Sequence, residues 1–165
     1  MFDLILRNGT VVTPHGTSRQ DVAISGEIIS AVTSPDAIDN TQTKRSIDVN
    51  GKIVMPGGID PHVHCKWIMP MPDGTFGFTE GPEIVSRAAL YGGTTTLIDF
   101  AARLEDIPFS EVIEKRDHDW VGNCYCDYSY HLMLLGDVEP PVLSELGGLI
   151  GDGYPTIKIF TTNIT

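Results

Sequence analysis

The sequence has 165 residues, 41% hydrophobic and 20% charged, a composition typical of one modest globular domain or of parts of two. Its formal net charge of −11, from 22 acidic and 11 basic side chains, argues against a nucleic-acid partner, because phosphate binding requires a basic surface. No apolar run is long enough to cross a bilayer and the first residues do not fit a signal peptide, so we expect a cytoplasmic protein.

Residues 1–55 are predicted to form short strands joined by tight turns. An apolar segment at 2–7 precedes Asn8-Gly9, a two-residue hairpin signal, and residues 10–13 form the expected return strand. Further strands are expected at 21–24, 27–32, 46–49 and 52–55. This pattern indicates a small all-β unit that is too thin to bury a core by itself.

From residue 56 onward, strands are predicted to alternate with helices. The strands are expected at 59–64, 94–100, 125–135 and 155–160. The helices are expected at 82–90, from a Ser110 cap to Trp120, and at 142–149. The alternation predicts a parallel sheet with crossover helices. An open doubly wound sheet and the first half of a closed eight-stranded barrel, which needs about 250 residues, both fit.

Two histidines separated by one residue, His62 and His64, are the sharpest chemical signal in the sequence. On a strand, alternate side chains point to the same face, so each imidazole can present one nitrogen to a single metal ion. Such a pair also arises by chance at strand ends, but the preceding Gly-Gly-Ile-Asp-Pro favours a metal site. Asp60 shares this face and is predicted either to orient a ligand or to make a structural hydrogen bond.

Lys158 lies inside the apolar segment 156–160, where a charged ammonium is costly to bury. One interpretation is a lysine at a strand end whose ammonium reaches water. The other is an amine that has added carbon dioxide, because the resulting carbamate is an anion that can bridge two metal ions. Both interpretations stay open on the residues alone.

The segment 65–78 follows the histidines and combines apolar side chains with prolines and glycines. Such a loop at the carboxyl end of a parallel strand predicts a substrate pocket, although packing or subunit contact explains it equally well. Asp99 and His131 are interpreted as structural polar groups rather than catalysts. The cysteines form no even framework and are interpreted as buried or half-buried free thiols: Cys65, Cys124 and Cys126.

These features together resemble the amidohydrolase superfamily, and within it the dihydropyrimidinase and hydantoinase branch. The resemblance covers essentially the whole chain and rests on residues 51–64 (GKIVMPGGIDPHVH), 89–99 (ALYGGTTTLID) and 157–160 (IKIF). It implies that residues 1–55 are the N-terminal part of a β-sandwich domain and that residues 56–165 are the first four β/α units of a (β/α)8 TIM-like barrel. The chain is then the N-terminal portion of a longer polypeptide, and is expected to be inactive by itself.

The resemblance also implies a site for two divalent metal ions, usually zinc. His62 and His64 bind one ion, and Lys158, carboxylated, bridges both, while two further histidines and a proton-carrying aspartate lie beyond Thr165. The implied reaction opens a cyclic amide ring, such as a hydantoin, a dihydropyrimidine or a related imide, by attack of a metal-bridging hydroxide. The implied partner is this small-molecule substrate, with no nucleic acid or membrane, and the complete protein is a dimer or tetramer.

One position departs from the family pattern. A tyrosine that polarises the substrate oxygen usually stands five residues after the lysine, whereas this sequence has Asn163 there. The departure puts the standard hydantoin-type substrate in doubt. We assign substrate contact to Asn163, since asparagine can still donate a hydrogen bond, and to Trp67.

Other functions fit the same pattern. Allantoinase is one, and dihydroorotase another, although dihydroorotases grip a substrate carboxylate with an arginine where this sequence has Lys66. A non-catalytic, dihydropyrimidinase-like scaffold protein is disfavoured, because both histidines and the lysine are present. A split or decayed enzyme, whose second half is made separately, is a further hypothesis.

Overall fold

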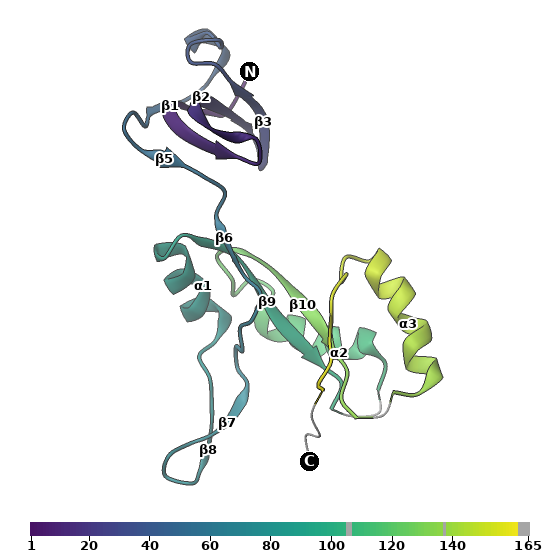
Figure 1. Cartoon of the computed structure of the whole chain (residues 1–165). Helices are drawn as coiled ribbons and strands as arrows, with labels where there is room; N and C mark the ends of the chain where they lie inside the picture. Colours follow the sequence, from purple (N-terminus) through teal and green to yellow (C-terminus); the bar gives the residue numbers. More distant parts are fainter. Residues whose placement is uncertain (105–106, 137, 162–165) are drawn as a thin grey trace. The chain divides into compact units, whose positions relative to one another are not determined.

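The computed structural model describes residues 1–104, 107–136 and 138–161, and it divides into two compact units, Met1–Pro56 and Gly57–Thr165 (Figure 1). The first unit contains only strands and one short helical turn, whereas the second alternates strands with helices. In these described ranges, no helix combines the length and the apolar character needed to span a membrane.

The first unit is a five-stranded sheet in the order β3-β2-β1-β4, with β5 also paired to β1. Its elements are β1 (Leu4–Thr13), β2 (Gly16–Ser25), β3 (Ile28–Thr33), η1 (Asn40–Gln42), β4 (Ser46–Asp48) and β5 (Ile53–Val54). The first three strands are antiparallel, whereas β4 and β5 run parallel to β1. A small core forms where Ile38 packs against Ile5 of β1 and Ala23 of β2, and the second layer of a sandwich stays a prediction.

The hairpin predicted at Asn8-Gly9 is wrong. β1 runs through these residues as one strand of ten residues, and its pairing with β2 shifts register at this point. Asn8 has a φ of 64°, the left-handed conformation that its turn signal favours, but it uses that conformation in a β-bulge. Its N–H donates to Asp21 Oδ1 at 2.8 Å. A tertiary hydrogen bond therefore replaces the turn, and the chain reverses only after Thr13.

The second unit is built on a four-stranded parallel sheet in the order β11-β10-β9-β6. Its strands are β6 (Gly58–Asp60), β9 (Thr94–Ala102), β10 (Asp127–Met133) and β11 (Ile157–Lys158). Its helices are α1 (Pro82–Tyr91), α2 (Phe109–Trp120) and α3 (Pro140–Gly151). The predicted alternation is present, although β6 and β11 are shorter than the strands predicted at 59–64 and 155–160.

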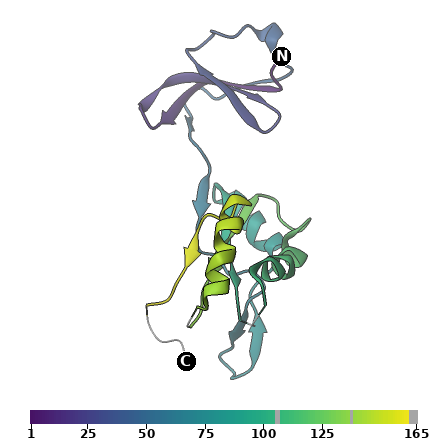
Figure 2. The same ribbon diagram turned by 90° about the vertical axis from the view of Figure 1, so that its right-hand side faces the viewer.

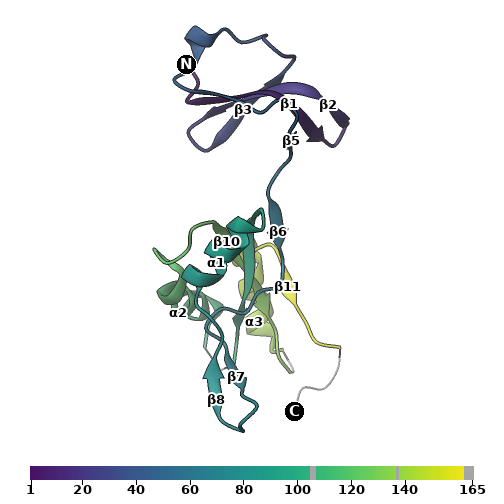
Figure 3. The same ribbon diagram turned by 90° about the vertical axis from the view of Figure 1, so that its left-hand side faces the viewer.

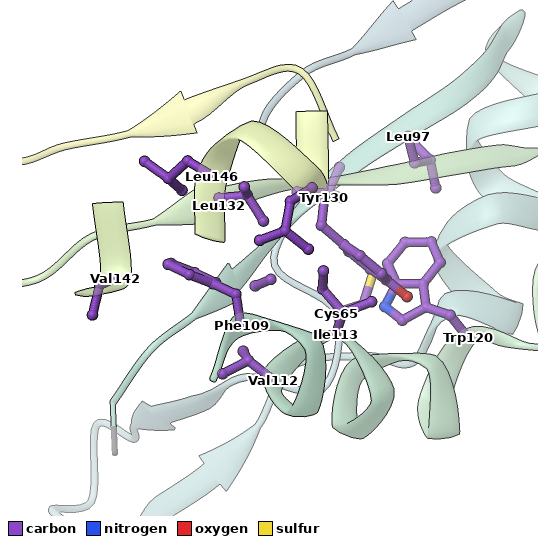
Figure 4. Close-up of a cluster of buried hydrophobic side chains, with 13 residues drawn as sticks. Cys65, Leu97, Phe109, Val112, Ile113, Trp120, Tyr130, Leu132, Val142 and Leu146 are labelled. Atoms are coloured by element: carbon purple, nitrogen blue, oxygen red, sulfur yellow. The ribbon is translucent and has the colours of Figure 1, made fainter. Parts of the chain in front are cut away.

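All three helices pack against the same face of this sheet. One buried core unites β9, β10, α2 and α3, and Figure 4 shows most of its side chains: Leu97, Tyr130, Leu132, Phe109, Val112, Ile113, Trp120, Val142 and Leu146. α1 adds the partly buried Val85 and Ala89. In two perpendicular views α2 and α3 lie on the same side of the strands (Figure 2). A doubly wound sheet carries helices on both faces, so this one-sided cover favours the barrel.

The helix boundaries follow local sequence signals except at the start of α2. α1 has Pro82 in its first turn and ends at Tyr91 with Gly92 as its C-cap, so it stops at the predicted glycines. α2, however, begins at Phe109, so the predicted cap at Ser110 is wrong. The Phe109 N–H donates to Glu145 Oε2 of α3 at 2.9 Å. A carboxylate from a neighbouring helix thus accepts the first N–H of α2.

The segment 65–78 contains a two-stranded hairpin. β7 (Ile68–Pro70) pairs antiparallel with β8 (Phe76–Phe78), and the pair projects from the sheet as an arm (Figure 3). Its apolar side chains are exposed, with Phe76 71% and Phe78 74% accessible. Whether this segment lines a substrate pocket stays a prediction.

Candidate metal centre

His62 and His64 lie just beyond β6, where the chain leaves the carboxyl end of that strand. The strand ends earlier than predicted, but the alternation continues, because Val63 and Cys65 are buried in the core whereas His62 and His64 are exposed. The Val63 N–H still donates to the Ile98 carbonyl of β9 at 3.2 Å. The two imidazole centroids are 5.2 Å apart, and the rings are tilted by 53°.

The ring of Phe100 is the surface on which the polar groups of this face meet. Phe100 lies in β9 and is only 1% exposed. The His64 imidazole stacks on it at 4.8 Å between centroids, and His62 meets it edge-on at 4.9 Å. His131 of β10 lies 5.3 Å away, and Lys158 Nζ is 5.8 Å from the ring centroid. Groups on or just beyond three strands, β6, β10 and β11, thus surround one aromatic ring that β9 supplies.

Lys158 reaches this position from the end of β11. It pairs in register with Met133 of β10, and its side chain is half-buried. The amine also lies 5.2 Å from the centroid of Phe160. The amine thus lies between two aromatic rings, and both interpretations of this lysine, an ammonium that reaches water and a metal-bridging carbamate, stay predictions.

His131 ties three strands together on the same face. Its Nε2 is 2.8 Å from the Pro61 carbonyl oxygen, to which it donates, and its Nδ1 is 2.7 Å from Thr156 Oγ1. In this tautomer Nδ1 accepts from the hydroxyl, so both ring nitrogens are occupied. The hydrogen bonds fix the residues just before His62 and just before β11, which is the structural role predicted for His131.

On the helix-covered face, the fully buried Asp99 accepts four hydrogen bonds. Oδ2 accepts from the Cys65 N–H at 2.9 Å and from Arg116 Nη2 at 2.7 Å. Oδ1 accepts from Trp67 Nε1 at 2.9 Å and from the Phe100 N–H at 2.6 Å. Arg116 Nη2 also lies 2.9 Å from the Cys65 carbonyl oxygen. The buried charge is therefore paired and saturated with donors.

The surroundings of His64 lower the pKa of its imidazole. Burial is the largest cause that lowers its pKa, while the carboxylate of Asp99 opposes the shift. The side chains of His62, of Arg116 and of Lys158 in its unmodified amine form lower the pKa further. A neutral imidazole is the form that binds a metal ion. Burial also raises the pKa of the neighbouring Cys65 to about 12, which makes this thiol unreactive.

The other residues singled out in the sequence have different fates. Asp60 Oδ1 accepts the backbone N–H of His62 at 3.1 Å, which is the structural hydrogen bond among the two predicted roles. The Trp67 indole meets the His64 imidazole edge-on at 4.8 Å, so it borders the site. Asn163 lies outside the described residues. Cys65 is buried, Cys124 and Cys126 are half-buried, and all three are free thiols, as predicted.

Two imidazoles and one amine on the same face fit part of a metal centre. Histidine nitrogen is a ligand that zinc and similar ions accept, and these imidazoles are adjacent and accessible. In the part of the chain that the structure describes, no group of three or more His, Cys, Asp or Glu side chains converges to hold a metal ion. The residues present therefore supply a partial ligand set.

Comparisons with known proteins point to one group of hydrolases, although no family model matches the chain. The D-hydantoinase of Streptomyces coelicolor is 34% identical over 158 residues, which cover 94% of this chain and 33% of that protein. The dihydropyrimidinase of Rattus norvegicus is 32% identical over 133 residues, 78% of this chain and 24% of that protein. The crystal structure of dihydropyrimidinase from Brevibacillus agri NCHU1002 has a TM-score of 0.75 and 34% identity, and covers 92% of this chain and 31% of that one.

The fold and these relatives place the chain in the amidohydrolase class of proteins. Within that class it belongs to the hydantoinase and dihydropyrimidinase branch, as its sequence motifs predict. The chain spans about a third of the length of the relatives it matches, 33% for the first two D-hydantoinases.

The sequence analysis did not assign two residues of the site, Phe100 and Arg116. Phe100 reads as one more apolar residue of a buried strand, and only the alternation along β9 separates it from the helix-covered Leu97. Arg116 had a usable signal, because it shares a helix face with the buried Val112 and Ile113. A cation on an apolar helix face requires a buried acid, and Asp99 is that acid.

Proposed function

We propose that the complete protein carrying this chain is a metal-dependent hydrolase that opens a cyclic amide ring, with hydantoins, dihydropyrimidines and related imides as its substrate class. The observation that carries the proposal is the approach of His62, His64 and Lys158 to one ring, that of Phe100. We further propose that the second unit is the first half of a (β/α)8 barrel and that the first unit belongs to a β-sandwich. The proposed protein is cytoplasmic and oligomeric.

The proposed ligands lie on the face of the sheet opposite the three helices, and each has a separate role. His62 and His64 are the proposed ligands of one ion, and Lys158, carboxylated, is the proposed ligand of two. Divalent ions such as zinc, when bound, supply Lewis acidity and ionise water near neutral pH. The ring of Phe100 packs against both imidazoles.

Substrate contacts are proposed for one described residue and one outside the described ranges. Trp67 commits its indole N–H to Asp99, so it offers the substrate only the apolar edge and face of its ring. Such a surface suits a flat heterocycle. Asn163 is proposed to donate a hydrogen bond to the substrate oxygen in place of the family's tyrosine.

The position of Lys66 argues against a carboxylated substrate of the dihydroorotase type. Its Nζ pairs with Asp119 Oδ1 of α2 at 3.0 Å, and its backbone N–H donates to the Glu80 carbonyl at 3.0 Å. The ammonium is thus engaged by a carboxylate of its own chain. Cyclic amides without a carboxylate are therefore the favoured substrates.

Metal content and the behaviour of Lys158 test this proposal on the complete protein. We expect close to two divalent ions per subunit, and Lys158→Ala should lose both ring-opening activity and at least one ion, because the bridging ligand is gone. Short carboxylic acids added to this variant should restore part of the activity by standing in for the carbamate. Ring-opening at the wild-type rate in Lys158→Ala would contradict the role assigned to Lys158, whereas a wild-type protein without stoichiometric metal would favour the scaffold hypothesis.

A further inference from the structure

We propose that Asp99, with its partner Arg116, is a positioning residue for the metal-binding segment. In this role its carboxylate holds the backbone of residues 64–67 from the helix-covered face and thereby sets where the His64 imidazole stands. The inference rests on the proposed function, in which His62 and His64 are metal ligands. It assigns Asp99 no contact with substrate or metal.

The pair holds the residue that follows His64 by both of its backbone groups. The Cys65 N–H donates to Asp99 Oδ2 at 2.9 Å, and the Cys65 carbonyl oxygen accepts from Arg116 Nη2 at 2.9 Å. The same Arg116 nitrogen is 2.7 Å from Asp99 Oδ2. These three groups form a closed ring of hydrogen bonds in a buried setting, where such bonds are strong and changes in geometry are costly.

Asp99 also fixes the side chain that packs against His64. Trp67 Nε1 donates to Asp99 Oδ1 at 2.9 Å, and the Trp67 ring lies edge-on to the His64 imidazole at 4.8 Å between centroids. The remaining donor is the N–H of Phe100, at 2.6 Å from Oδ1. Phe100 is the ring on which His64 stacks. Two of the four donors therefore belong to residues that touch the His64 imidazole.

Hydrogen bonds also hold the residues on either side of Cys65, so a backbone shift at Cys65 would be transmitted to His64. The His64 carbonyl accepts from the Thr79 hydroxyl, and the Trp67 N–H donates to Thr79 Oγ1 at 2.9 Å. Lys66 has a φ of 53°, a conformation that non-glycine residues rarely adopt. Surrounding contacts are needed to hold such a residue in place. The carboxylate of Asp99 is the only buried charge among the acceptors named here that hold residues 64–67.

An isosteric change tests the carboxylate specifically. Asp99→Asn keeps the shape but turns one acceptor oxygen into a donor, which then faces either Cys65 and Arg116 or Trp67 and Phe100. Asp21→Asn is the matched control, because Asp21 is the other fully buried aspartate among the residues that the structure describes, and it is paired with Arg7 in the first unit. The probe is Co²⁺ added to the metal-free complete protein, read by its visible absorption.

We expect Asp99→Asn to bind Co²⁺ at least about tenfold more weakly than the wild type and with a changed absorption spectrum, since altered support of a ligand changes both affinity and geometry. Asp21→Asn should lose thermal stability yet keep wild-type affinity and spectrum. Arg116→Lys retains the charge but loses the planar guanidinium that reaches both Asp99 and the Cys65 carbonyl oxygen. It should therefore weaken Co²⁺ binding by about threefold.

The outcomes separate the two proposals. Wild-type Co²⁺ affinity and spectrum in Asp99→Asn, or in Arg116→Lys if Asp99→Asn does not fold, would overturn the positioning role and leave the metal site intact. A wild-type protein that binds no Co²⁺ would overturn the proposed function, and with it the role of Asp99. Equal loss of affinity in Asp21→Asn and Asp99→Asn would show that only general stability is measured, which also overturns the positioning role.

Discussion

Within the described residues, each unit buries an aspartate–arginine pair, and the two pairs differ in what they hold. Asp21 accepts from Arg7 Nη1 at 2.8 Å, from the Asn8 N–H at 2.8 Å and from the Asp36 N–H at 3.1 Å. These donors close a β-bulge and a loop within one sheet. Asp99 instead accepts from the segment that carries His64 and from the Trp67 side chain that touches it.

The chemistry of the two pairs is nearly the same. Both aspartates are fully buried, and within the described residues the Nε of each arginine lacks a hydrogen-bond partner. A buried carboxylate binds whatever donors the fold brings to it, because leaving either side unpaired is costly. The comparison teaches that the role of such a pair is decided by the segments its donors belong to, and not by the pair itself.

The largest effect is expected from a residue that belongs to neither pair. His62→Ala in the complete protein should reduce ring-opening activity by at least about a hundredfold, because a proposed ligand is lost. The free energy of unfolding of the metal-free protein should change by less than about 0.5 kcal/mol, since this side chain is exposed. Activity assays beside denaturant unfolding check both. Near-normal turnover would refute the metal assignment.

A smaller effect, confined to stability, is expected at the pair of the first unit. Asp21→Asn should destabilise residues 1–56 by about 3 kcal/mol, because Arg7 is left buried without its carboxylate. Hydrogen exchange of the complete protein should show the loss of protection in β1 and β2, with β9 and β10 unchanged. A loss of protection spread evenly over both units would contradict a role of the Asp21–Arg7 pair confined to the first unit.

The smallest effect is a pH dependence of the same pair. Burial opposes ionisation of Asp21, but hydrogen bonds from Asn8, Arg7 and Asp36 outweigh it, so its pKa in the folded state is lowered from 3.8. The contribution to stability is present above the unfolded pKa and is lost as the pH falls through the folded value. We therefore expect the stability gap between wild type and Asp21→Asn to narrow below about pH 4. A gap that stays constant down to pH 3 would show that ionisation of Asp21 does not stabilise the unit.

Much of the second unit could be predicted from local patterns. The β-branched run at 94–100, the proline and glycines around α1 and the pair His62 and His64 each depend on near neighbours in the sequence. The prediction failed where a distant side chain changed a local preference. Asn8 has a turn conformation but donates to Asp21, and α2 begins at Phe109, whose N–H donates to Glu145, rather than after a Ser110 cap. Neither partner is visible in a short window of sequence.

The sequence alone determined which residue types are available for chemistry and roughly where the strands and helices that carry them lie, because those signals are local. The tertiary structure decided which of these residues meet. It brought Lys158 and His64, 94 positions apart by their numbers, to the ring of Phe100. It also made Asp99 an anchor for the segment after β6. The physical reason is that strand pairing and one-sided helix packing set the faces of the sheet, and only residues on one face can share a site.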